Sequence, residues 1–139
     1  MKTTRKEKCT LIELTPTNVN AAPISLIVPF EEKREVTLIA GKGSFFEIPL
    51  LGHRYTDLAF TEEVRTICLA VIAGTLTESV LFDGDEVLQG VGSIKLAQAS
   101  APTTVRWRQI YFRPFRKKEK KHFEYEPYSA SCSDSSRKV

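Results

Sequence analysis

Residues 36–48 read VTLIAGKGSFFEI, in which two apolar segments flank the short run Gly41-Lys42-Gly43. Both segments are rich in β-branched and aromatic residues, which favour strands. Glycine adopts positive φ angles without steric cost, so the two glycines suit a tight reversal of the chain. The stretch therefore predicts a β-hairpin in which residues 36–40 pair with residues 45–48.

A second hairpin is predicted where Asp83-Gly84-Asp85 separates the apolar residues 80–82 from residues 87–88. An Asp-Gly pair between apolar runs is a strong hairpin signal. The other apolar runs are also short and are bounded by Pro, Gly, Asn or Asp, which is typical of strands. We therefore expect strands at residues 9–14, 24–28, 35–40, 45–51, 65–73, 79–82, 86–96 (in one piece or in two, divided at Gly90 and Gly92) and 103–112.

Residues 62–73 allow two interpretations. Val64, Ile67, Cys68, Val71 and Ile72 would form one face of a helix, with Thr61 as its cap and two glutamates in its first turn. The many β-branched residues lose χ1 freedom in a helix, however, and a buried strand also reads as a continuous apolar run. We favour a strand and keep the helix as the alternative.

The fold class predicted is all-β: an antiparallel β-sandwich, or small jelly-roll-like domain, of about eight short strands. No alternation of strands and helices indicates a parallel sheet. The expected organisation is a basic N-terminal arm (residues 1–8), a β-domain (residues 9–113) and a tail (residues 114–139) that is first basic and then rich in serine.

The net charge of +3 conceals an uneven distribution. Residues 1–8 contain four basic side chains and one acidic side chain, a net charge of +3. Residues 9–105 contain six basic and twelve acidic side chains, a net charge of −6. Residues 106–121 contain eight basic side chains against one glutamate, a net charge of +7. An acidic body with basic ends indicates an anionic partner or contacts between the ends and the body.

The tail is expected to be disordered from residue 115 or from residue 129 onward, because its last residues contain too little apolar surface to offset the entropy of ordering. Phe123, Tyr125 and Tyr128 could dock on the body, so the boundary stays open.

The strand predicted over residues 103–112 carries the candidate binding residues. Side chains alternate between the two faces of a strand, so Arg106 and Arg108 project together, opposite Trp107. Guanidinium groups match the geometry of phosphates, and aromatic rings can stack on exposed bases. The candidate nucleic-acid-binding residues are Arg106, Arg108, Tyr111, Phe112, Arg113, Phe115, Arg116, Lys117, Lys118, Lys120 and Lys121.

Two classes of function follow from these patterns, both without catalysis. The first is electrostatic binding of nucleic acid, RNA or single strands, in a layout that is analogous to small viral capsid-like or movement-type proteins. The second is a module for protein partners or self-assembly, whose basic tail serves localisation, including nuclear import through residues 116–121. A solvated charged face with no specific role is the structural alternative to both.

Other chemistry finds little support in the sequence. Gly41-Lys42-Gly43 lacks the spacing of a phosphate-binding loop. The sequence specifies no nucleophile for the polar stretch of His53 and Asp57, and the acids at residues 83–86 lack a calcium-loop pattern. We predict no cofactor and no metal.

The sequence also predicts where the protein is located. It has three widely spaced cysteines, no secretory signal and no apolar run of about 20 residues. These features predict an intracellular protein, cytoplasmic or nuclear, without a membrane span.

Overall fold

The computed structural model describes residues 1–32, 34–97, 99–108 and 118–129. In these residues the chain forms nine strands and one helix. They are β1 (Lys2–Arg5), β2 (Cys9–Leu14), β3 (Ile24–Pro29), β4 (Glu35–Ala40), β5 (Ser44–Pro49), α1 (Leu58–Ile72), β6 (Thr77–Asp83), β7 (Glu86–Ile94), β8 (Thr103–Arg108) and β9 (Lys118–Glu124).

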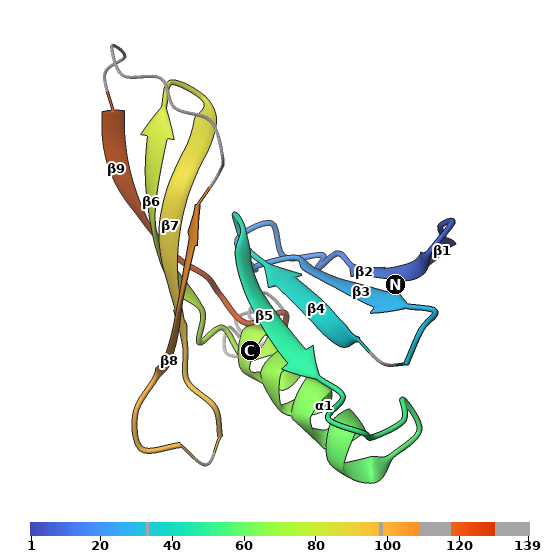
Figure 1. Cartoon of the computed structure of the whole chain (residues 1–139). Coiled ribbons are helices and arrows are strands. Elements are labelled where there is room, and N and C mark those ends of the chain that lie inside the picture. The colour runs from blue at the N-terminus through green and yellow to red at the C-terminus, as the bar shows by residue number, and fades with distance from the viewer. Residues whose placement is uncertain (33, 98, 109–117, 130–139) are drawn as a thin grey trace.

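The strands form two antiparallel sheets (Figure 1). The N-terminal sheet has the order β1-β2-β3-β4-β5, and the C-terminal sheet has the order β8-β7-β6-β9. The two sheets contact each other where β5 meets β7 and β8. The prediction of a mainly β, antiparallel, sandwich-like domain is confirmed.

Both predicted hairpins are present. In the first, Ala40 pairs with Ser44, so that Gly41, Lys42 and Gly43 form the turn. In the second, Asp83 pairs with Glu86. β7 continues through its two glycines as one strand, because these glycines leave room for side chains of neighbouring strands and do not break the ladder.

The segment in which we favoured a strand is a helix, so that preference was wrong. α1 begins at Leu58, four residues before the predicted segment, and Asp57 is its N-cap residue. The hydroxyl of Thr66 donates to the carbonyl oxygen of Glu62 (2.7 Å), which gives the β-branched side chain a partner within the helix.

Tertiary packing explains why the helix forms. Phe60 and Val71 are buried, Phe60 against Val36, Ile48 and other apolar residues of the N-terminal sheet. Burial of each large apolar side chain contributes about 1.5–3 kcal/mol, whereas a β-branched residue costs only a few tenths of a kcal/mol in helix propensity. The free energy gained by packing the helix on the sheet is therefore larger than the loss in helix propensity. This gain depends on residues that are far from the helix in the sequence.

The predicted N-terminal arm is part of a sheet. β1 pairs with β2 in antiparallel register, from Lys2 opposite Glu13 to Arg5 opposite Thr10. The guanidinium of Arg5 lies 5.1 Å from the centre of the Phe30 ring. Backbone pairing and this cation–π contact hold the segment on the sheet. Its charge alone had indicated an arm separate from the domain.

The side chain of Glu78, on β6, connects the two sheets. It is 1% exposed. Its carboxyl oxygens accept hydrogen bonds from the backbone N–H groups of Lys42 (2.8 Å) and Ser44 (3.3 Å) in the first hairpin. The hydroxyls of Ser44 (2.5 Å) and Tyr125 (2.6 Å) donate to it as well. Each carboxyl oxygen thus accepts two hydrogen bonds, and all four come from outside β6.

Of the two boundaries predicted for the disordered tail, residue 115 is wrong, because residues 118–129 are ordered by contacts with the body. β9 pairs with β6 along its full length. Beyond it, Asn18 donates from Nδ2 to the side chain of Glu126 (3.2 Å) and to the carbonyl of Pro127 (3.1 Å). The hydroxyl of Tyr128 donates to the carbonyl of Ala22 (2.8 Å). These contacts, with the partial burial of the tyrosine rings, order a segment that the charge pattern could not distinguish from a solvated tail. Residues 130–139 lie outside the described residues.

We predict that Glu78→Gln lowers the free energy of unfolding by about 2–4 kcal/mol, because the amide nitrogen would face two donors and leave them without an acceptor. Tyr125→Phe removes one donor and should cost about 1 kcal/mol. Chemical denaturation measures both. Glu47→Gln, at an exposed position of β5, is the matched control and should stay within about 0.5 kcal/mol. Equal effects of the two glutamine variants would contradict this role of Glu78.

A second prediction concerns alkaline pH. Burial raises the pKa of Tyr128 to about 12 from 10.0, and burial, with the hydrogen bond to Glu78, also raises the pKa of Tyr125. The folded state therefore favours the neutral phenols, so this contribution to stability is present below about pH 10 and is lost as the pH rises towards 12. In denaturation series across this range, the variant with Tyr125→Phe and Tyr128→Phe should lose less stability than the natural chain. Parallel losses would show that these phenols do not govern the transition.

Candidate nucleic-acid interface

β8 alternates between the two faces of the C-terminal sheet as the sequence predicts. Trp107 is buried, with 7% of its surface exposed, whereas Arg106 and Arg108 are exposed. We call the face that carries the two arginines the outer face, and the face that carries Trp107 the inner face. The burial of Trp107 fixes which side of β8 meets solvent.

Glycines make room for the Trp107 ring. Gly90 is the direct partner of Trp107 on β7. A Cβ atom at Gly90 would lie 2.6 Å from Cε2 of the indole, and one at Gly43 would lie 3.0 Å from its Cζ3. The ring therefore lies against two backbones, one from each sheet. Any larger residue at position 90 would therefore overlap the indole ring of Trp107.

Cross-strand pairing defines the composition of the outer face, because paired residues of an antiparallel ladder project to the same side. One row across the sheet contains Arg108, Gln89, Leu81 and Lys120, in the order of the strands. The next row contains Arg106, Val91, Ser79 and His122. Cations therefore occupy the two outer strands, about 14 Å apart, and uncharged side chains fill the middle.

The outer face is hollowed. A concavity of about 630 Å³ is lined by Arg106, Arg108 and Lys120, together with uncharged residues of β6 and β7. Phe45 of β5 stands at this concavity and is 36% exposed. The hollow thus combines three cations with an accessible aromatic ring from the other sheet.

The cations of this concavity have no acidic partner in the part of the chain that the structure describes. Within the described ranges, Arg106, Arg108 and Lys120 form no ion pair with an acidic side chain. Glu124, on the same side of β9, lies 3.6 Å from Nε2 of His122 instead. Nδ1 of the same ring lies 3.2 Å from the hydroxyl of Ser79. The acid is thus paired with the histidine, and the three cations remain available to an external anion.

The structure separates the predicted site residues into three groups. Arg106, Arg108, Lys118 and Lys120 share the outer face by strand alternation. Lys121 belongs to the inner face, with its ammonium group 5.2 Å from the centre of the Phe82 ring. The remaining predicted residues lie outside the described residues: Tyr111, Phe112, Arg113, Phe115, Arg116 and Lys117.

Sequence reasoning missed other residues of this surface, namely Phe45, Ser79, Gln89 and His122. Phe45 carried a signal, because alternation along β5 separates it from the buried Phe46. His122 carried none, since it lies in a segment that we expected to be disordered. Its position depends on β9 pairing with β6, a contact between distant parts of the chain.

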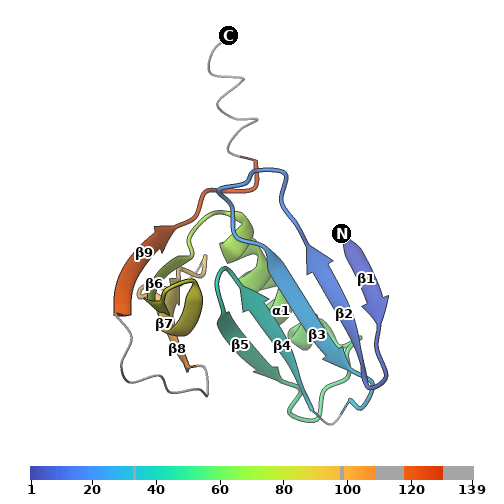
Figure 2. The ribbon, with the colours of Figure 1, turned by 90° about the horizontal axis from the view of Figure 1, so that it is seen from above.

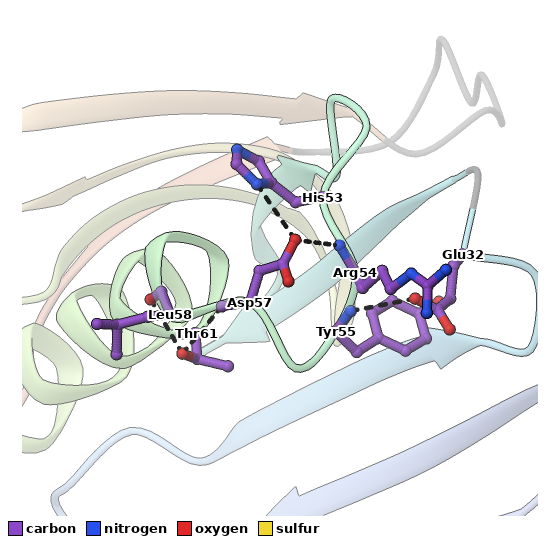
Figure 3. A network of polar contacts seen from close by, with 7 residues as sticks. All are labelled: Glu32, His53, Arg54, Tyr55, Asp57, Leu58 and Thr61. Atoms are coloured by element: carbon purple, nitrogen blue, oxygen red, sulfur yellow. Dashed lines mark hydrogen bonds and ion pairs between the residues drawn. The ribbon is translucent and has the colours of Figure 1, made fainter.

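The polar residues before α1 stabilise a loop (Figure 3). The carboxylate of Asp57 accepts a hydrogen bond from the backbone N–H of Arg54 (2.8 Å) and lies 3.4 Å from Nδ1 of His53. These contacts, the backbone bond foremost, lower the pKa of Asp57. The hydroxyl of Tyr55 donates to the carbonyl of Pro29 and so ties the loop to the end of β3. These contacts account for the shape of the loop.

The described residues contain no group of three or more His, Cys, Asp or Glu side chains that could hold a metal ion. Likewise, the described part of the chain has no helix with the length and apolar character needed to cross a membrane. Comparison with known protein families, curated proteins and solved structures found no match.

We predict that Gly90→Ala destabilises the protein by about 1–3 kcal/mol, because the new methyl group overlaps the Trp107 ring. Since the chain has a single tryptophan, its fluorescence reports on this site directly and should shift to longer wavelength as the indole is displaced. Ser93→Ala, on the same strand, is the control and should leave both the emission and the denaturation midpoint close to those of the natural chain. An unchanged spectrum in Gly90→Ala would disprove the close packing.

Proposed function

We propose that the protein binds single-stranded nucleic acid, RNA or DNA, on the outer face of the C-terminal sheet, without catalysis. The observation that carries the proposal is the set of three cations around one concavity, Arg106, Arg108 and Lys120, without ion-pair partners in the described residues. Nucleic acid in the cytoplasm or the nucleus is the partner proposed.

The spacing of the cations suits a phosphate backbone. Arg106 and Arg108 are two residues apart on one strand, so their Cα atoms lie about 7 Å from each other. Lys120 lies across the sheet from Arg108, about 14 Å away. Contacts of this kind release counterions and supply affinity that does not depend on sequence. Arginine, with its planar fork of donors, is the side chain best suited to bidentate phosphate binding.

A single strand fits this surface better than a duplex. The middle of the outer face presents short or uncharged side chains, namely those of Ser79, Leu81, Gln89 and Val91. Unpaired bases can lie on such a surface, and the exposed ring of Phe45 offers a place for one base to stack. A duplex would present only its backbone and would leave the aromatic ring unused.

The test is fluorescence anisotropy with a labelled oligo(dT) or oligo(U), titrated with the full chain at several salt concentrations. The logarithm of affinity should fall linearly with the logarithm of salt concentration. Arg106→Gln with Arg108→Gln should reduce the magnitude of this slope by about 1.4, or about 0.7 per lost contact, and weaken binding roughly tenfold or more.

The matched control is Arg34→Gln with Arg54→Gln. It removes the same charge at two exposed positions in the connections that follow β3 and β5. This variant should retain most of the affinity. No binding at low salt, or equal losses in the two double variants, would overturn the proposal, because the second result would mean that net charge alone attracts the strand.

A further inference from the structure

The N-terminal sheet is wider than the helix that covers it. Five strands at about 4.8 Å spacing extend over about 19 Å, whereas a helix with its side chains is about 10–12 Å wide. Figure 2 shows α1 against the middle of this sheet, with β1 beyond its side. Among the residues that the structure describes, no other element covers the part of the inner surface of the sheet over β2 and β3.

An apolar groove of about 310 Å³ occupies this region. Its sheet side is formed by Ile12, Leu26, Val28 and Val36, and its helix side includes Phe60 and Val64. Except for the buried Val36 and Phe60, these side chains are only partly buried, so the groove is open to solvent while its lining is apolar. The volume is at the lower end of the range for small-molecule sites.

The hydroxyl groups in the groove already have acceptors. Tyr55 donates to the carbonyl of Pro29, and Thr61 donates to the backbone carbonyls of Asp57 (3.2 Å) and Leu58 (3.0 Å). Neither hydroxyl hydrogen therefore requires a partner from a ligand. The body of a ligand in this groove would be held by apolar contact alone.

Arg65 gives the groove its only charge among the lining residues that the structure describes. Its Nη1 lies 3.7 Å from Oε1 of Glu62, and both side chains are more than half exposed, at 66% and 54%. Exposed pairs of this length are weak, so the guanidinium can exchange this partner for a bidentate anion. The groove thus combines an apolar body with one cation.

We propose that this groove binds a medium-chain fatty carboxylate, with its hydrocarbon chain along β2 and β3 and its carboxylate on the guanidinium of Arg65. The site is separate from the proposed nucleic-acid surface: it lies between the N-terminal sheet and α1, and no residue is shared by the two linings. Each methylene that enters the groove should raise the affinity about fourfold.

The experiment uses the full chain labelled with ¹³C at its methyl groups, titrated with octanoate, decanoate and decyltrimethylammonium below their micelle concentrations. Decanoate should shift the methyl signals of Ile12, Leu26, Val28 and Val64 in a saturable way. It should bind about fifteenfold more tightly than octanoate, which has two fewer methylenes, and roughly tenfold more tightly than the cation of equal chain length.

Variants locate the site and assign the charge. Val64→Phe fills the groove and should abolish the shifts, whereas Leu69→Phe, at a 48% exposed position of the same helix, should keep them. Arg65→Gln, at an exposed position, should reduce the preference for decanoate over the cation to less than about twofold. Thermal melting confirms that each variant is folded.

Several outcomes would overturn the inference. Absence of methyl shifts at saturating decanoate would exclude the site, and undiminished binding by Val64→Phe would place the ligand elsewhere. Equal binding of the anionic and cationic ligands by the natural chain would remove the role of Arg65. None of these results bears on oligonucleotide binding, so the two proposals can fail independently.

Discussion

The carboxyl group of Glu78 is the contact on which the arrangement of the two sheets depends. It is buried, and a buried acceptor of this kind is tolerated only when its hydrogen bonds are satisfied. Its donors come from the first hairpin and from Tyr125, far apart in the sequence. The C-terminal sheet can therefore occupy one position relative to Lys42 and Ser44, since any other position leaves a polar group buried without a partner.

This junction has consequences for both open surfaces. The inner face of the C-terminal sheet contacts the first hairpin through Glu78 on β6 and through the ring of Trp107 on β8. The outer face carries Arg106, Arg108 and Lys120, which form no ion pair with an acidic side chain in the described residues. On the other side of the junction, the single helix covers only part of the N-terminal sheet. Two exposed surfaces of different character result, one cationic and one apolar.

Local sequence patterns were sufficient to predict the elements that depend on contacts between residues close together in the chain. Both hairpins and the exposure of Arg106 and Arg108 follow from turn residues and strand alternation, and they could be predicted. α1 was predicted only as the alternative to a strand, because its stability comes from packing on strands earlier in the chain. β9 could not be predicted, since its charges indicated solvent and its pairing with β6 depends on distant residues. Once β9 is known as a strand, alternation assigns Lys120 to the candidate site and Lys121 to the opposite face; sequence reasoning had grouped the two together.

The contacts made by the segment after β9 also bear on the order in which the protein folds. Asn18 and Glu126 are separated by 108 residues, and Tyr128 and Ala22 by 106. Closing loops of that length costs about 4 kcal/mol in chain entropy, which short-range hairpins do not incur. The hairpins can thus form early, and the segment that joins the two ends of the domain is added late. For the same reason we expect this segment to open early, and if β9 separates with it, β6 becomes an unpaired edge of the C-terminal sheet.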